Sequence, residues 1–136
     1  MLHISIDTIP QKQHEYATYG NYKGHIRRRF IEVSELNDWR WEFLIALHEL
    51  IEQNIALALG LSEAEILAWD LAHLESDDPG SLDGCPYKFM HLYAERAEKD
   101  MCRMCNWDYE EYCKALDKHS DKEWPKDDFI KTGNLA

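Results

Sequence analysis

One segment, from Asn37 to Gly60, constrains the fold of this 136-residue chain more than any other. It contains no proline and no internal glycine, and its apolar side chains recur at the spacing of one face of an α-helix. Gly60 is a frequent helix C-terminal stop. The sequence therefore predicts a long helix from Asn37 to Leu59.

His48 and Glu52 lie in the middle of the apolar arc of this predicted helix. At roughly 100° per residue, Glu52 lies about 40° from His48, and Ile45 and Ile55 flank the pair. A carboxylate in a core is costly unless it is paired or bound to a metal. His and Glu four residues apart on a helix can bind one cation, although a buried His–Glu hydrogen bond is the alternative. Glu49 lies on the flank of the arc, about 100° from His48.

A second predicted helix, from Tyr87 to Cys105, repeats the pattern with His91 and Glu95, and Glu98 lies on the same stripe. A solvated helix face with local salt bridges is the alternative for the two glutamates. If the helices pack together, four side chains converge on one cation: His48, Glu52, His91 and Glu95. Two imidazoles and two carboxylates suit zinc or another divalent transition metal.

The remaining segments predict an α+β fold, in which a small N-terminal antiparallel sheet of two or three strands precedes about four helices. The predicted strands are the alternating segment 2–6, the segment 16–22 and the segment 25–33, with a hairpin turn between Gly20 and Gly24. The other two helices are predicted from Ser62 to Leu74 and from Asp108 to His119. We expect one domain over residues 1–120 and a loosely attached tail over residues 121–136.

The net charge of −11 argues against partners with an anionic surface, either nucleic acid or a lipid membrane. The one basic cluster, Arg27-Arg28-Arg29, lies in a predicted strand and is typical of a solvated edge. The N-terminus does not resemble a signal peptide, and no apolar stretch reaches membrane length. We therefore expect a cytoplasmic protein.

Further metal-binding residue types occur outside the two helix stripes. The four cysteines are expected to be free thiols, with a structural zinc at Cys85, Cys102, Cys105 and Cys113 as the alternative. Asp70 and His73 are three residues apart and either share the predicted site, brace it, or form a surface pair.

The strand, turn and helix around Phe43-Leu44-Ile45-Ala46-Leu47-His48-Glu49-Leu50 resemble the core of zincin-type metallopeptidases. They also resemble small, mostly uncharacterised phage-encoded proteins with a similar His-Glu-Leu segment. The resemblance implies a zincin-like domain in which His48 binds zinc, Glu49 is the general base that polarises the metal-bound water, and a later helix supplies another ligand. Glu52 stands where the zincin motif has His. A carboxylate there partly neutralises the cation and makes the bound water less acidic.

Three functions are compatible with these residues. The first is a metal-dependent hydrolase of peptide or amide bonds, with a peptide or protein as substrate and Glu49 as the base. The second is an all-α nucleotide pyrophosphatase of the MazG type, which would hold magnesium through Glu49, Glu52, Glu95 and Glu98. The third is a non-enzymatic interaction protein with a structural metal.

Overall fold

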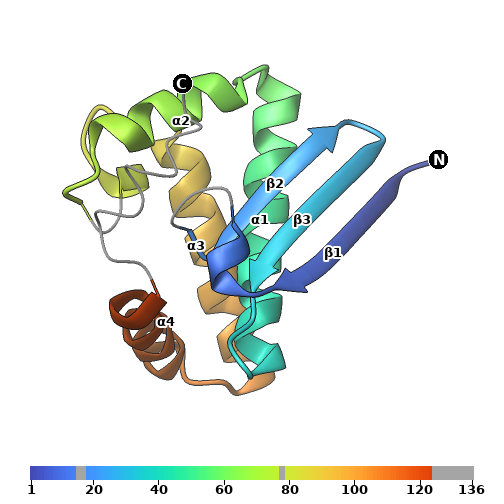
Figure 1. Ribbon diagram of the computed structural model, residues 1–136. Coiled ribbons are helices and arrows are strands. Elements are labelled where there is room, and N and C mark those ends of the chain that lie inside the picture. Colours follow the sequence, from blue (N-terminus) through green and yellow to red (C-terminus); the bar gives the residue numbers. More distant parts are fainter. Residues whose placement is uncertain (15–17, 77–78, 124–136) are drawn as a thin grey trace.

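The computed structural model describes residues 1–14, 18–76 and 79–123, in which a three-stranded sheet is followed by four α-helices (Figure 1). The strands are β1 (His3–Ile9), β2 (Gly20–His25) and β3 (Arg28–Ser34), and the helices are α1 (Trp39–Leu59), α2 (Glu63–Ala72), α3 (Lys88–Cys105) and α4 (Tyr109–Glu123). Two short 3-10 helices, η1 (Gln11–Gln13) and η2 (Pro79–Ser81), lie in the connections. The predicted α+β class, with a small N-terminal sheet and about four helices, is confirmed.

The sheet is mixed, whereas an antiparallel sheet was predicted. Its strand order is β1-β3-β2, and β3 pairs antiparallel with β2 but parallel with β1. The connection after β1 carries the chain past the position of β3, so that β1 and β3 run in the same direction on neighbouring positions (Figure 1). The hairpin turn falls at Ile26 and Arg27, after β2, because Gly20 and Gly24 both belong to that strand.

The helix boundaries follow capping residues that are visible in the sequence. The side chain of Asp38 accepts a hydrogen bond from the Arg40 backbone N–H, and α1 ends at Gly60 in the left-handed conformation. Ser62 Oγ accepts from the Glu65 backbone N–H at 3.2 Å and starts α2. Helix α4 continues beyond the predicted end to Glu123, and most of the predicted tail lies outside the described residues. None of the described helices combines the length and the apolar character needed to cross a membrane.

Helix α1 lies between the sheet and α3 (Figure 1). One side of α1 packs on β2 and β3, where Ile31 and Val33 are fully buried against Leu44 and Ile45. Another side packs along α3, which buries Met90 and Ala94 completely. A helix in this position buries residues on two sides, which explains why α1 is apolar over much of its circumference. The α1–α3 contact is the one that carries His48 and Glu52.

Candidate metal centre

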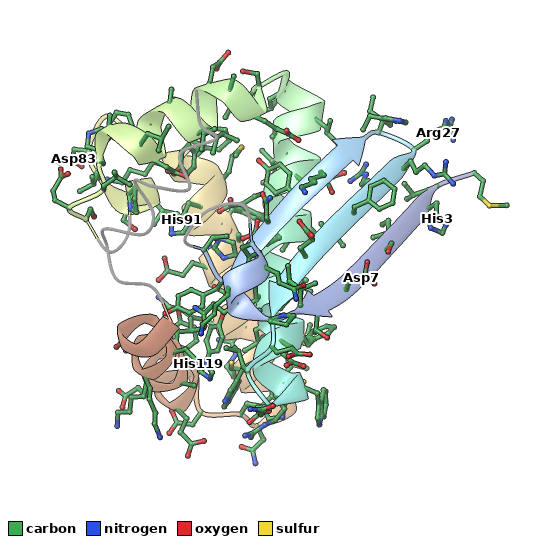
Figure 2. The ribbon with its side chains drawn as sticks, in the orientation of Figure 1. His3, Asp7, Arg27, Asp83, His91 and His119 are labelled. Atoms are coloured by element: carbon green, nitrogen blue, oxygen red, sulfur yellow. The ribbon has the colours of Figure 1, made fainter. Side chains whose placement is uncertain are left out.

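His48 and Glu52 of α1 meet His91 of α3 where the two helices pack. His48 Nε2 lies 2.6 Å from Glu52 Oε1, and His91 Nδ1 lies 3.0 Å from the same oxygen. The two imidazole rings are 4.9 Å apart, edge to face. In the described part of the chain, this is the one group of three or more His, Cys, Asp or Glu residues whose ligand atoms lie within 4.8 Å of one another. Figure 2 shows His91 well inside the molecule, in contrast to His3 and Asp7 on the outermost strand.

The donor set of this group fits a divalent transition metal. Two imidazole nitrogens and one carboxylate oxygen form a ligand set found in zinc proteins. The three side chains are only 14% (His48), 9% (Glu52) and 17% (His91) exposed, so that water competes weakly for the position between them. A metal here would join α1 to α3, because His91 is 39 residues from Glu52 and farther still from His48. Three of the four predicted ligands are thus brought together.

Glu98 occupies the place expected of a residue that orients a metal ligand. Its Oε2 lies 3.2 Å from His48 Nδ1, the ring nitrogen on the side away from Glu52. The hydroxyl of Tyr112, on α4, donates to Glu98 Oε1 at 2.5 Å. Glu98 and Tyr112 are 4% and 3% exposed. In metal sites a ligating histidine commonly donates its second N–H to such a carboxylate, which fixes the ring orientation and raises ligand basicity.

Replacing Tyr112 by phenylalanine tests whether this contact supports the site. We expect Tyr112→Phe to weaken zinc binding by about 10- to 100-fold, because Glu98 loses the donor that holds it against His48. The measurement is a competition titration against a chromophoric zinc indicator. Tyr109→Phe, on the same helix, removes a hydroxyl that contacts Cys113 and is the matched control. Equal zinc affinity in the two variants would show that Glu98 does not act through Tyr112.

The other predicted ligands lie outside the cluster. Glu95 forms an ion pair with Lys99, with 3.5 Å between Oε1 and Nζ, and its side chain is 29% exposed. His73 packs its ring on Trp69 and contacts the Trp69 carbonyl at 2.8 Å through Nδ1. The four cysteines are free, with Cys85 and Cys102 buried and Cys105 exposed.

The metal-free site holds a strongly coupled set of charges. Burial lowers the pKa of His48, but hydrogen bonds to Glu52 and Glu98 outweigh burial, and the net pKa lies well above the ordinary value. Burial raises the pKa of Glu52, and the hydrogen bonds with His48 and His91 more than reverse this, so that the net pKa is lowered. Without metal, the two hydrogen-bond acceptors on either side of the ring therefore favour the protonated form of His48.

Glu49 lies against this cluster from the sheet side of α1. Burial and the neighbouring Glu52 carboxylate raise the pKa of Glu49. Strand β2 approaches closely here, since a Cβ added to Gly20 would lie 2.8 Å from Glu49 Cγ and 2.6 Å from Ile45 Cγ2. Only glycine permits this approach without displacing one of the two side chains.

Tyr22, two residues after Gly20 on the same face of β2, points a polar group toward the same region. Its hydroxyl is buried and has no hydrogen-bond partner among the described residues. Burial, followed by the charges of Glu52 and Glu49, raises the pKa of Tyr22. Because a buried hydroxyl without a partner is costly, this atom is suited to a bound water or ligand group beside the carboxylates. Nothing in the local sequence distinguished Tyr22 from an ordinary core tyrosine.

The segment before α3 holds His91 from the opposite side. A Cβ added to Gly80 of η2 would lie 2.8 Å from His91 Cγ and 3.0 Å from Tyr87 Cε2. The Tyr87 hydroxyl donates to the Asp70 carboxylate of α2. Asp70 is thus linked to the start of α3 through Tyr87, and its predicted bracing of the site stays a prediction.

Comparison of the chain with protein-family models, with curated proteins and with solved structures gives no match. The geometry of the site is therefore the basis for its interpretation. It combines three possible ligand atoms, a carboxylate that orients the first histidine, a half-buried carboxyl group at the flank and a nearby unsatisfied hydroxyl. Such an arrangement can bind a cation and hold or move a proton next to it.

Proposed function

We propose that the protein binds one divalent transition metal ion, best matched by zinc, through His48, Glu52 and His91, and that it hydrolyses peptide or amide bonds. The observation that carries the proposal is that one possible ligand atom from each residue lies within 4.8 Å of the other two. Catalytic zinc sites have three protein ligands and keep one coordination position open, whereas structural sites have four. The resemblance of the His48-Glu49 segment to zincins also supports a catalytic metal site.

Each residue around the ligands has a distinct part in this proposal. The metal would supply a more acidic water and a polarised carbonyl group. Glu49, on the flank of the site, accepts a proton from the attacking water and passes it to the leaving amine. Its pKa is raised by burial next to Glu52 in the metal-free protein, and a bound cation would lower it. Glu98 holds the His48 ring through Nδ1 and does not contact the substrate.

The variant Glu49→Gln tests the catalytic part of the proposal. We expect it to retain one zinc per chain and to lose at least about 100-fold in kcat, since the amide cannot accept a proton. Hydrolysis is followed with a fluorogenic peptide library on zinc-loaded protein, and metal content by elemental analysis. Glu65→Gln, at an exposed position on α2, is the matched control and should keep full activity. An active Glu49→Gln variant would exclude Glu49 as the base.

The second candidate is a non-enzymatic protein in which the metal only joins α1 to α3. The low exposure of the three proposed ligand side chains favours it. In that case chelation lowers the Tm, and neither the natural protein nor any variant hydrolyses peptides. The pyrophosphatase alternative has no comparable support. Of its four carboxylates only Glu52 belongs to the ligand group, while Glu95 pairs with Lys99 and Glu98 with His48.

A further inference from the structure

Strand β1 leaves one edge of its backbone unpaired. It is an edge strand of the sheet, and no described strand pairs with its outer side (Figure 1). Toward β3, the His3 N–H donates to the Arg27 carbonyl at 2.8 Å, and the Ile9 carbonyl accepts from the Glu35 N–H at 2.9 Å. Alternate residues of a strand direct their backbone groups to opposite edges. Ile4 and Ile6 therefore present N–H and C=O groups outward, as a template for another strand.

The same strand carries an apolar face that the helices do not cover. Helix α1 packs on β2 and β3, and β1 extends beyond it. On the face toward α1, Leu2, Ile4 and Ile6 are 55%, 37% and 51% exposed. Next to them lies a groove of about 440 Å³, whose lining includes Leu2, Ile4, Leu50, Ile51, Ile55 and Tyr93. An open edge with alternating apolar side chains is a site of association.

The opposite face of β1 sets His3 and Asp7 each opposite a β3 residue of the same charge type, although the Glu32 carboxylate also pairs with Lys23 of β2 at 3.2 Å. At one end His3 lies directly opposite Arg28, and at the other end Asp7 lies directly opposite Glu32. Like charges directly opposite each other in a sheet are unfavourable, and the first pair counts when His3 is protonated. Figure 2 shows His3 near the start of the outermost strand and Asp7 farther along it. The basic pair and the acidic pair lie on either side of Ser5, each two residues away.

Pairing of two β1 strands about a two-fold axis through Ser5 would set residues of opposite charge type against each other. Antiparallel pairing of two β1 strands about that axis sets His3 opposite the partner's Asp7, so that a basic His3–Arg28 row continues into an acidic row. On the apolar face it sets Ile4 opposite the partner's Ile6. Ile4 and the partner's Ile6 then exchange both backbone hydrogen bonds. Ser5 faces the partner's Ser5 in a pair without backbone hydrogen bonds.

We propose that the protein is a homodimer in which two β1 strands pair antiparallel about Ser5, forming one continuous six-stranded sheet. The partner is a second copy of the chain, because the backbone edge, the isoleucines and the charges are all self-complementary about one residue. The proposal is independent of the metal site, which lies between α1 and α3. It holds or fails whether or not the chain binds zinc.

Size-exclusion chromatography with light-scattering detection tests whether the protein is a dimer. The chain has a mass of 16.1 kDa, and we expect a species of twice that mass. Ile6→Lys should give a folded monomer, because a lysine on the open edge disfavours strand pairing. Ile26→Lys, in the β2–β3 turn at 62% exposure, is the matched control and should remain dimeric. Circular dichroism confirms that both variants are folded.

Cysteines introduced one at a time into β1 test the register, in a Cys105→Ser background that removes the exposed natural thiol. Cα atoms of a pair without hydrogen bonds lie about 4.5 Å apart, a distance that a disulfide can span. Ser5→Cys should therefore form a covalent dimer on mild oxidation. His3→Cys and Asp7→Cys should not, because each lies four residues, roughly 14 Å, from its own copy along the strand.

A natural protein that elutes as a monomer at its highest soluble concentration would overturn the dimer. A dimer in which Ser5→Cys links no faster than the other two cysteines would overturn this interface. A dimer that Ile6→Lys leaves intact would do the same.

Discussion

The variant His48→Ala is expected to lose stoichiometric metal and about 3–5 kcal/mol of the free energy of unfolding of the metal-free protein. His48 would supply one of the three proposed ligand atoms, so its loss leaves two. When protonated, it also supplies a positive charge between Glu52 and Glu98, both of which are buried. Removing one partner of a buried charge pair is costly because the other charge stays uncompensated. Elemental analysis and urea denaturation measure the two effects.

His73→Ala is the matched control, since this imidazole packs on Trp69 outside the cluster. It should keep one metal ion per chain. If His48→Ala is too unstable to purify, His91→Ala separates the two effects, because His48 then remains between its two carboxylates. It should lose the metal with a smaller loss of stability. Either histidine variant that keeps one zinc per chain would eliminate the site proposed here.

Zinc is expected to stabilise the folded protein more at pH 8 than at pH 5.5. At a free zinc concentration of a thousand times the Kd, the stabilisation is about 4 kcal/mol. The pKa of His48 is raised by folding, so its stabilising contribution is complete below about pH 6.5 and is lost as the pH rises through the folded pKa. The pKa of Glu52 is lowered, so its contribution is complete above about pH 4.5 and is lost as the pH falls. Zinc needs neutral His48 and therefore binds more tightly as the pH rises.

Thermal unfolding with chelator and with zinc measures both trends across this range. With chelator, Tm should fall as the pH rises through the folded pKa of His48. With zinc, the gain in Tm should grow over the same interval. A zinc-dependent gain that is the same at pH 5.5 and pH 8 would mean that no titrating imidazole binds the metal. His91→Ala should have no gain at either pH.

The half-site on α1 was predictable because the angular spacing within one helix is fixed. His48 and Glu52 share the apolar arc whatever the helix packs against. The residues on α3 depended in addition on how that helix is rotated. Its buried arc contains Met90, Ala94, Glu98 and Cys102, and its centre lies between Ala94 and Glu98, about 40° from His91. Glu98 lies within that arc, whereas Glu95 lies about 80° from its centre and pairs with Lys99.

Contacts between distant segments were beyond the reach of local patterns. The alternation of Ile4 and Ile6 indicated a strand, but the parallel neighbour of β1 depends on the path of the connection to β2. Tyr112 is an ordinary buried aromatic until α4 docks and places its hydroxyl on Glu98. The capping residues Asp38 and Ser62, in contrast, act within one turn of helix, and the starts of α1 and α2 were predicted to within two residues.

Because the proposed ligands come from two helices, metal binding during refolding would show when α3 docks on α1. Glu52 and His48 are four residues apart and come into position when α1 forms, whereas His91 arrives only through a contact 39 residues from Glu52. Local helix formation precedes such long-range docking, because closing the intervening loop costs entropy. In stopped-flow refolding, the appearance of a cobalt absorption band should therefore lag behind helix formation and coincide with the docking of α3.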